Sequence, residues 1–299
     1  MKRLGILHII LLGLIFSCQP DKKVEDNALL FSKDNLVAWC IVPFDTLQRT
    51  PENRALMLSE LGIKQFAYDW RVKHIPSFPL EVRAMKYLNI KLAAVWIWID
   101  PDSAEVIIDH SNKQILDVIR RYKVNTDLWV GFGDRYLEGL TDEQKLDKAT
   151  KAVQVIADSA KALGCGISLY NHGDWFGEPA NEIRIIEKTG RKDIGIVYNF
   201  HHGHQQVAEF PALLKQMLPY LKTVNLNGMK AGGPQILPIG QGDLELEMLK
   251  TLKASGYNGS IGILGHVSNE DIKIVLQRNI EGLKSLLKAM GDEKALATY

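Results

Sequence analysis

The sequence predicts an α/β fold, a single-domain (β/α)₈ barrel in which eight parallel strands alternate with helices. Short apolar runs alternate with segments whose apolar residues repeat at helical spacing, over residues 36–290 of the 299-residue chain. Residues 291–299 are left as a C-terminal tail. The alternative is an open, doubly wound sheet. A dinucleotide-binding sheet has no positive support, because no Gly-x-Gly-x-x-Gly pattern follows the first apolar run.

The expected strands are apolar runs of five to nine residues, at 36–42, 64–69, 91–99, 126–132, 165–170, 194–199, 221–226 and 260–264. The expected helices lie at 51–61, 79–88, 112–122, 142–163, 180–189, 207–218, 246–255 and 270–290. Thr50 before Pro51 is a typical helix start, and Thr141 with Gln144 forms a capping box. Gly164 directly follows the expected helix at 142–163 and is a typical helix end.

The composition is that of an ordinary globular protein, with 46% hydrophobic and 24% charged residues. There are 36 basic and 35 acidic residues, for a net charge of +1. Because no broad basic field is available, the composition argues against nucleic acid as a partner. Cys40 and Cys165 lie far apart in apolar runs, so we expect buried thiols with no catalytic role and no disulfide framework.

The start of the chain has the features of a bacterial lipoprotein signal. Met1–Arg3 is basic, and Leu4–Phe16 is apolar but too short to span a bilayer. Cys18 follows a small residue, as in a lipobox, and is the expected lipidation site. We therefore expect a signal peptide at 1–17, a polar tether at 18–35 and an exported lipoprotein, periplasmic or outer-membrane associated. It would touch the membrane only through its lipid anchor. The alternative is an ordinary secretory signal.

Polar residues follow every expected strand from the second to the eighth, at the end where a barrel of this kind carries its active site. In the first half of the chain these residues are Asp69, Asp100, Asp134 and Arg135. In the second half they are Asn171, His172, Asn199, His201, His202, Asn227 and His266. The second half therefore presents amides and imidazoles from four consecutive strands, and no carboxylate.

Such groups suit proton transfer next to a ketone, which needs a base for the C–H proton and donors for the enolate oxygen. Imidazole can act as that base near neutral pH. We expect His202 and His172 to be the acid/base residues and Asp69 to serve as a further acid or base. His201 and His204 are expected to be loop residues or to support the site.

A further set of polar and aromatic residues is expected to contact a small-molecule carbohydrate. The amides would donate to its carbonyl and hydroxyl groups, the carboxylate would accept from hydroxyls, and the indole would lie under the sugar ring. The set consists of Asn199, Asn227, Asp134, Trp175, Tyr170 and His266.

Several of these motifs resemble the xylose isomerase-like TIM barrels, the sugar phosphate isomerase/epimerase group. They are the Asn171-His172 pair, the Asn199-x-x-His202 end of the sixth strand and the segment Leu237–Asp243. The Asn227-Gly228 end of the seventh strand resembles a secreted branch associated with the breakdown of 3-keto sugars. The resemblance implies a TIM barrel over residues 36–290 and isomerisation, epimerisation or hydration/elimination of a keto sugar.

The resemblance also implies a divalent metal, but this chain departs from the ligand pattern of the metal-dependent members. Tyr170, Asn199 and Leu264 stand where those members carry Glu, Asp and Glu, while His202 is retained. Mg²⁺ and Mn²⁺ need carboxylate oxygens, which are missing here. A softer Zn²⁺ site formed by His172 and His202, with His266 as a further ligand, is the alternative.

Two classes of function follow from these features. The first is an enzyme that moves a proton on a keto or aldo sugar. The second is a catalytically silent carbohydrate-binding lipoprotein, which the loss of the carboxylates favours. The sequence carries no indication of the oligomeric state.

Overall fold

Eight parallel strands close into a barrel in the computed structural model, which describes residues 27–99, 106–133 and 135–299. The strands lie in sequence order, and β1 pairs with both β2 and β8. They are β1 Leu36–Trp39, β2 Gln65–Tyr68, β3 Lys91–Ile99, β4 Asp127–Phe132, β5 Gly166–Tyr170, β6 Ile194–Asn199, β7 Leu221–Leu226 and β8 Ser260–Leu264. The predicted barrel is confirmed, and the open doubly wound sheet is excluded.

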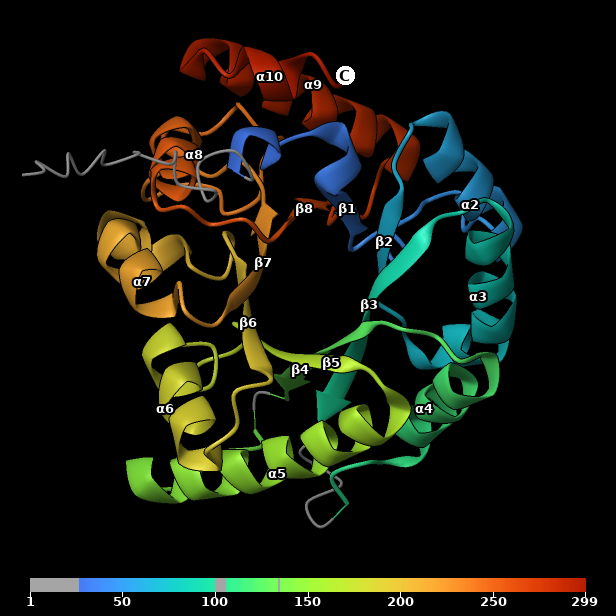
Figure 1. Ribbon diagram of the computed structural model, residues 1–299, viewed down its shortest axis with the longest axis vertical. Helices are drawn as coiled ribbons and strands as arrows, with labels where there is room; N and C mark the ends of the chain where they lie inside the picture. The colour runs from blue at the N-terminus through green and yellow to red at the C-terminus, as the bar shows by residue number, and fades with distance from the viewer. Residues whose placement is uncertain (1–26, 100–105, 134) are drawn as a thin grey trace, which may run out of the picture.

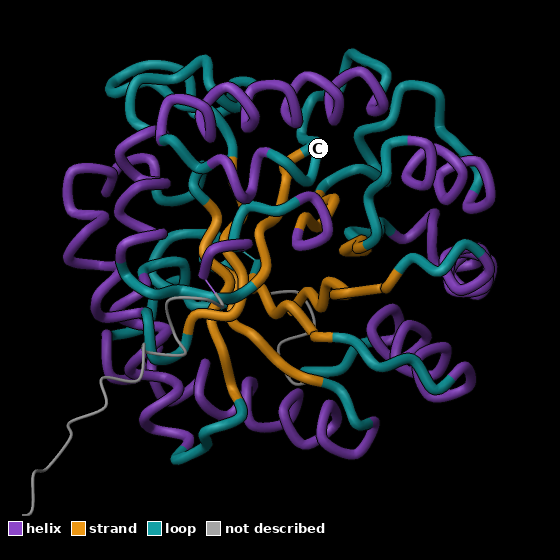
Figure 2. The backbone as a smooth tube through the Cα atoms, turned by 45° about the horizontal axis from the view of Figure 1, so that its top comes forward, coloured by secondary structure: helices purple, strands orange, loops and turns teal. Residues whose placement is uncertain are grey.

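Helices surround the strands as an outer ring, as Figure 1 shows from one end and Figure 2 from a tilted view. They are α2 Pro51–Glu60, α3 Phe78–Tyr87, α4 His110–Tyr122, α5 Asp142–Leu163, α6 Pro179–Thr189, α7 Phe210–Met217, α8 Glu245–Ala254 and α9 Ile272–Met290. Each follows one strand, from α2 after β1 to α9 after β8, and packs an apolar face onto the sheet. The main core therefore lies between the two layers.

Two of the predicted element boundaries differ from the structure for clear backbone reasons. The first strand ends at Trp39, because Cys40 has a φ of +56° and extended pairing cannot continue through that left-handed conformation. The helix expected at 207–218 is split into a 3₁₀ segment, η5 His204–Glu209, and α7, which starts with a proline in its first turn. The other predicted ends lie within two residues of the observed ones.

The structured domain is longer at both ends than the sequence predicts. Residues 27–35, expected in the tether, form the 3₁₀ turns η1 Asn27–Leu29 and η2 Lys33–Asn35, and the side chain of Phe31 is fully buried. In the expected tail, α10 Glu293–Leu296 packs against α9, and the Tyr299 hydroxyl donates to the carbonyl of Phe31 (2.8 Å). The predicted signal peptide and Cys18 lie outside the described residues. None of the described helices is long and apolar enough to cross a membrane.

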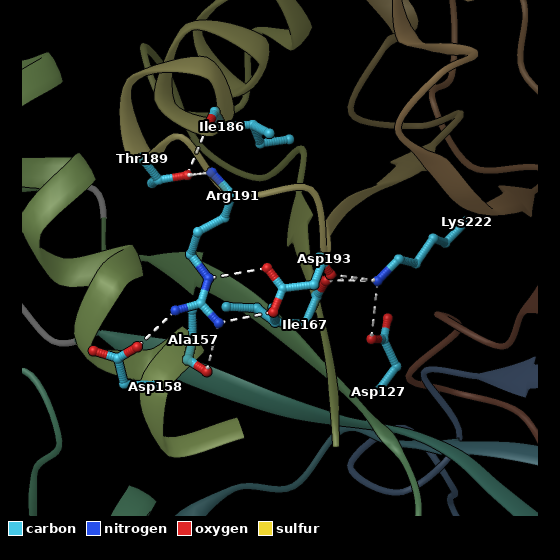
Figure 3. Close-up of polar contacts among 9 residues, drawn as sticks. All are labelled: Asp127, Ala157, Asp158, Ile167, Ile186, Thr189, Arg191, Asp193 and Lys222. Carbon is cyan, nitrogen blue, oxygen red and sulfur yellow. Dashed lines mark hydrogen bonds and ion pairs between the residues drawn. The ribbon is translucent and has the colours of Figure 1, made fainter. Parts of the chain in front are cut away.

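Charged side chains at the amino end of the barrel are paired with one another and with backbone carbonyls (Figure 3). Lys222, near the start of β7, donates to the carbonyl of Asp193 (3.1 Å) and lies 3.8 Å from a carboxylate oxygen of Asp127 at the start of β4. Arg191 forms ion pairs with Asp158 (2.6 Å) and Asp193 (2.7 Å). These contacts join β4, α5 and β7 to the segment that precedes β6, so this end of the barrel serves stability.

Aromatic rings fill the interior of the barrel. The centre of the Trp39 ring lies 4.9 Å from that of Trp129, 5.5 Å from that of Trp96 and 5.6 Å from that of Tyr170. Aromatic pairs at these separations are favourable. This layer forms a floor, and the space above it opens at the carboxyl ends of the strands.

Candidate active site

A cavity of about 360 Å³ lies at the carboxyl-terminal mouth of the barrel, above the aromatic floor. Its walls combine indole and phenyl rings with four imidazoles and a few charged groups. The lining residues are Trp39, Cys40, Phe44, Asp69, Trp70, Arg71, Val72, Trp96, Trp98, Asp109, Ser111, Tyr170, His172, His201, His202 and His266. A pocket that is mostly apolar, with a few converging polar groups, is typical of a small-molecule site.

Two tryptophans of β3 form one wall. The Trp96 and Trp98 rings are stacked with their centres 5.3 Å apart, and both are half-buried. Gly131 on β4 makes room for them, because a Cβ at this position would lie 2.8 Å from the Trp98 ring. The imidazole of His172 stands edge-on to Trp98, with ring centres 5.0 Å apart. The wall therefore offers flat apolar faces next to a polar group.

The four imidazoles come from β5, β6 and β8 and lie close to one another. The ring centre of His202 is 3.7 Å from that of His201 and 4.5 Å from that of His172. The ring centres of His201 and His266 are 5.8 Å apart. Because protonated imidazoles at these separations would repel one another, the cluster favours neutral rings.

Burial lowers the pKa of three of these histidines. The pKa of His201 falls to about 3, because its ring is desolvated and His266 and His172 are close. Burial also lowers the pKa of His202 far below its usual range, with a further contribution from His201. The pKa of His266 is lowered by burial and by the positive charge of Arg71. All three rings are therefore neutral near pH 7 and can accept a hydrogen bond, whereas burial opposes their protonation.

Asp69 brings a carboxyl group to the cavity directly after β2. Its side chain is 2% exposed, and one oxygen, Oδ1, accepts the backbone N–H of Val42 (3.2 Å). The other oxygen, Oδ2, has no hydrogen-bond partner among the described residues. Burial raises the pKa of Asp69 to about 7, although the nearby charge of Arg71 opposes the shift. Near neutral pH this group can either give up or take a proton.

Cys40 lies next to Asp69 and also lines the cavity. Burial raises the pKa of the Cys40 thiol well above its usual value, and the neighbouring Asp69 adds to the shift. The thiol therefore keeps its proton, and the group is a weak nucleophile. Cys40 is a buried, free thiol as predicted, whereas Cys165 is only half-buried.

A chain of hydrogen bonds runs from the barrel floor to the imidazole cluster. The indole N–H of Trp39 donates to the hydroxyl oxygen of Tyr170 (3.1 Å), and the Asn199 side-chain amide also donates to that oxygen. The amide oxygen of Asn199 lies 2.9 Å from Nδ1 of His201. Since an amide oxygen only accepts, His201 carries its proton on Nδ1, and Nε2 is its basic nitrogen.

The structure brings together five of the residues that the sequence proposes for the site. Asp69, Tyr170, His172, His202 and His266 all line the one cavity. They come from strands 2, 5, 6 and 8, so closure of the barrel gathers residues almost 200 positions apart. Asp134, like Asp100, lies outside the described residues.

Asn199 and Asn227 do not line this cavity, contrary to the expectation that they contact substrate directly. Asn199 is fully buried, and its amide is bonded to Tyr170 and His201. Asn227 is 1% exposed, and its N–H groups donate to the carbonyls of Gly228 (2.8 Å) and Gln235 (2.7 Å). Its donors hold the loop after β7, so they are not available to a sugar.

Trp175 was expected under a sugar ring, and the structure places it outside the cavity. Its indole N–H donates to a carboxylate oxygen of Asp142 (2.7 Å) at the start of α5, and the guanidinium of Arg184 lies 5.8 Å from its ring centre. Trp175 lies instead in a neighbouring hollow of about 400 Å³, which shares His172 with the cavity and is also lined by Arg135 and Phe176. This loop indole serves packing between α5 and α6.

The sequence interpretation missed several residues that line the cavity. His201 was assigned a supporting role, although it is 7% exposed and contacts both His202 and His266. Trp39 follows Val37 at period two, which places both on the interior face of the barrel, but this run was interpreted only as a strand. Arg71, two positions after Asp69, carried no recognised motif.

The donor atoms at the mouth do not fit the divalent cation that the resemblance implies. Among the described residues, no cluster of three or more His, Cys, Asp or Glu side chains is arranged to hold a metal ion. The hydroxyl oxygen of Tyr170 already accepts two N–H groups, and Leu264 offers no donor atom. A hard cation such as Mg²⁺ or Mn²⁺ requires several oxygen ligands. A zinc site at His172 and His202 stays a prediction.

No family model and no curated protein sequence matches the chain. Solved structures do match it. They include the 3-keto-D-glucoside 4-epimerase of E. coli in its apo form, with a TM-score of 0.62, 15% identity, and coverage of 86% of this chain and 99% of that one. An L-ribulose 3-epimerase matches with a TM-score of 0.64, 14% identity, and coverage of 88% and 98%. The probable 3-DHS dehydratase of Bacillus anthracis matches with a TM-score of 0.66, 11% identity, and coverage of 83% and 98%.

The chain has the same (β/α)₈ barrel fold as these solved structures. The resemblance seen in the strand-end motifs is confirmed at this level. Because identities of 11–15% establish the fold alone, the activity has to be argued from the residues in the cavity.

Proposed function

We propose that the protein is an enzyme that acts on a keto sugar by moving a proton on a carbon next to the carbonyl group. One observation carries the proposal: four imidazoles, a buried carboxyl group and several indole rings line a single cavity at the mouth of the barrel. Barrels of this fold place their active sites at this end. Structural neighbours named as sugar epimerases support a carbohydrate substrate.

The acid/base residues in this proposal lie on opposite walls of the barrel. Asp69 follows β2, whereas His202 follows β6, four strands away in the closed eight-strand order. A base on one wall removes the C–H proton, and the carbonyl electrons move to oxygen to give an enolate. Return of a proton from the opposite wall inverts the carbon, which is epimerisation. Return at the neighbouring carbon is isomerisation, and loss of a hydroxyl from the enolate is elimination.

The proposed roles rest on the positions of the two groups and on their protonation states near pH 7. His202 is neutral near pH 7, which is the form that a base needs, although burial lowers its pKa and so makes it a weaker base than an exposed imidazole. Asp69, with a pKa of about 7, is present in both forms and can return a proton from the other side. His172 lies 4.5 Å from His202, measured between ring centres, and is positioned to serve as the second acid/base group on the same wall.

A 3-keto sugar is the specific substrate class that we propose. Trp96 is stacked against both Trp39 and Trp98, so the Trp98 ring is the one that we propose to lie against the C–H groups of a pyranose ring. The neutral imidazoles can hydrogen-bond to hydroxyl groups as donors or acceptors. A ketone in the ring acidifies the neighbouring C–H groups, which the acid/base residues need.

Deuterium incorporation separates this function from its rival, a silent carbohydrate-binding protein. The purified domain is incubated in D₂O with 3-keto and 2-keto glucose derivatives and with the parent aldoses, and products are followed by nuclear magnetic resonance. We expect protein-dependent deuterium uptake next to the ketone of at least one keto sugar. Binding of these sugars with neither exchange nor turnover across the set favours the binding protein and contradicts the proposed enzyme.

We also propose that the protein is exported and anchored through a lipid on Cys18, in the periplasm or at the outer membrane. The basic and apolar start of the chain and the position of Cys18 support this proposal. Labelling of cells with an alkyne fatty acid should mark the wild-type protein and leave Cys18→Ala unmarked. Equal labelling of both proteins contradicts the anchor.

A further inference from the structure

The hydroxyl group of Tyr170 sits at the floor of the cavity in an unusual hydrogen-bonding position. Its oxygen accepts one N–H from Trp39 (3.1 Å) and another from Asn199. An indole N–H can only donate, so the Tyr170 oxygen must act as an acceptor in that contact. A phenol that accepts two hydrogen bonds still has one proton to donate.

That proton has no acceptor among the described residues, since the hydroxyl takes part only in the two bonds that it accepts. The Tyr170 side chain is 1% exposed, yet it lines the cavity. Buried donors in proteins are nearly always paired, so an orphaned donor at a cavity floor indicates a ligand atom. The ligand atom that fits is an oxygen acceptor.

The surroundings of Tyr170 strengthen this donor and fix its position. Hydrogen bonds accepted by a hydroxyl oxygen polarise its O–H group. The ring packs against Trp39, Trp96 and Trp129, with centres 4.8–6.1 Å apart, so it cannot reorient freely. On the cavity side, its ring centre lies 5.6 Å from that of His202, which places the donor next to the proposed base.

We infer that Tyr170 is the electrophilic residue of the site, which donates its hydroxyl proton in a hydrogen bond to the carbonyl oxygen of the bound keto sugar. This inference rests on the proposed function and adds to it the group that stabilises the enolate. Trp39 and Asn199 are positioning residues that act through the tyrosine oxygen. In other enzymes a metal cation can stabilise the enolate oxygen. Here Tyr170, a neutral side chain of the barrel floor, takes that role.

The reaction step balances without a further reactant. The C–H bond next to the ketone breaks, and its proton moves to the base. The bonding pair forms a C=C bond, and the π electrons of the carbonyl move to oxygen. The negative charge that develops on that oxygen strengthens the hydrogen bond from Tyr170, so the interaction is stronger in the transition state than in the ground state.

The variant Tyr170→Phe tests the inference, because it removes the hydroxyl and keeps the ring that packs in the floor. With a methyl 3-keto-glucopyranoside in D₂O, kcat for deuterium uptake should fall about 100- to 1,000-fold, the usual loss for one such donor. KM should stay within about threefold, since the interaction is made mainly in the transition state. Circular dichroism checks that the fold is retained.

Tyr198→Phe is the matched control. Tyr198 lies on β6, is fully buried, and its hydroxyl has no hydrogen-bond partner among the described residues. Its ring packs against Phe200 and Phe210, on the helix side of the barrel. Like Tyr170→Phe, this variant loses a buried tyrosine hydroxyl, but one that lies outside the cavity. The exchange rate should therefore stay within about twofold of wild type.

A second readout does not depend on turnover. Infrared difference spectra of the same probe, with ¹³C at the ketone, report the carbonyl stretch in the bound state. The stretch should shift to lower frequency in wild type and move back in Tyr170→Phe.

Exchange that is equally fast in Tyr170→Phe and Tyr198→Phe overturns the role of Tyr170 and leaves the proposed function standing. A shifted carbonyl with no exchange in wild type overturns the function and supports the donor. A probe that does not bind overturns both.

Discussion

Charged side chains at the amino end of the barrel are paired, whereas two polar groups at its mouth lack a partner, within the described part of the chain, for one of their atoms. At the amino end, Lys222, Asp127 and Arg191 are paired with opposite charges or backbone carbonyls. At the carboxyl mouth, an oxygen of Asp69 lacks a partner and the proton of Tyr170 has no acceptor among the described residues. The difference indicates that the amino end stabilises the barrel, whereas the carboxyl mouth keeps polar atoms available to bind a substrate.

Leaving such groups unpaired has an energetic consequence. A buried polar atom without a partner costs about 1–3 kcal/mol of stability. At a functional site a protein tolerates this cost because a bound substrate can pair with the atom. We therefore expect substitutions at the mouth to change the reaction and to maintain or raise stability, whereas substitutions at the amino end should lower stability and leave the reaction unchanged.

The largest expected effect is the loss of proton transfer in His202→Ala. Removal of a general base slows a reaction about 100- to 10,000-fold. Because His202 is only half-buried, replacing it with alanine should not disturb the fold. Deuterium uptake into a keto sugar measures the change. His110→Ala, which removes an exposed imidazole at the start of α4, is the control and should match wild type. Activity of His202→Ala within a few-fold of wild type shows that another group is the base.

Asp69→Asn should slow exchange and, at the same time, stabilise the fold at alkaline pH. Because the folded-state pKa of Asp69 is raised to about 7, the folded protein holds this proton more tightly than the unfolded chain. Stability therefore declines as pH rises from about 4 to 7, and the neutral amide avoids that loss. The gain in the free energy of unfolding should be about 1–3 kcal/mol at pH 8 and should vanish near pH 4.

Urea unfolding of both proteins across this pH range measures the gain. Wild-type Asp69 and the amide have similar shape, and the amide oxygen can still accept the N–H of Val42. A gain that is constant with pH would show that packing, and not ionisation, separates the two proteins.

Lys222→Met tests the amino end of the barrel. The methionine keeps most of the aliphatic chain but removes the donor to the carbonyls of Ile167 (3.0 Å) and Asp193 (3.1 Å). Since the side chain is 40% exposed, water replaces part of what is lost, and the free energy of unfolding should fall by only about 1 kcal/mol. Exchange kinetics should be those of wild type. A change in kcat would contradict the separation of the two ends.

An effect of similar size but opposite sign is expected for Glu182→Gln on α6. This carboxyl group is fully buried outside the cavity, neither of its oxygens has a partner among the described residues, and burial raises its pKa well above the usual value. The neutral amide should stabilise the protein by roughly 1 kcal/mol at pH 8 and less at pH 5. Thermal unfolding measures the gain, and exchange should not change. A destabilised variant would reveal a partner of the carboxylate.

The sequence predicts the barrel well because strand and helix periodicity are local properties. The apolar runs ending at Asp69, His172, His202 and His266 also place these groups correctly, since parallel strands end at one face. Trp175 was misplaced because its loop runs back toward α5, and no local pattern encodes that direction. Asn227 was misassigned because its amide is used by a loop contact eight residues away.

The hydrogen-bond chain through Tyr170 was beyond sequence reasoning for a different reason. Trp39, Tyr170 and Asn199 lie on three strands, and their contact depends on how the barrel closes. Individually each residue is an ordinary member of an apolar strand. Only the closed barrel shows that two donors meet one hydroxyl oxygen.

The most direct test of the account is deuterium uptake by the wild-type protein before and after removal of metal. The protein is dialysed against a chelator, its metal content is measured by mass spectrometry, and exchange into a 3-keto glucoside is followed in D₂O. We expect exchange next to the ketone at the same rate in both samples, carried by His202, Asp69 and Tyr170. No exchange, or exchange that is lost with the metal and restored by Zn²⁺ or Mn²⁺, would contradict it.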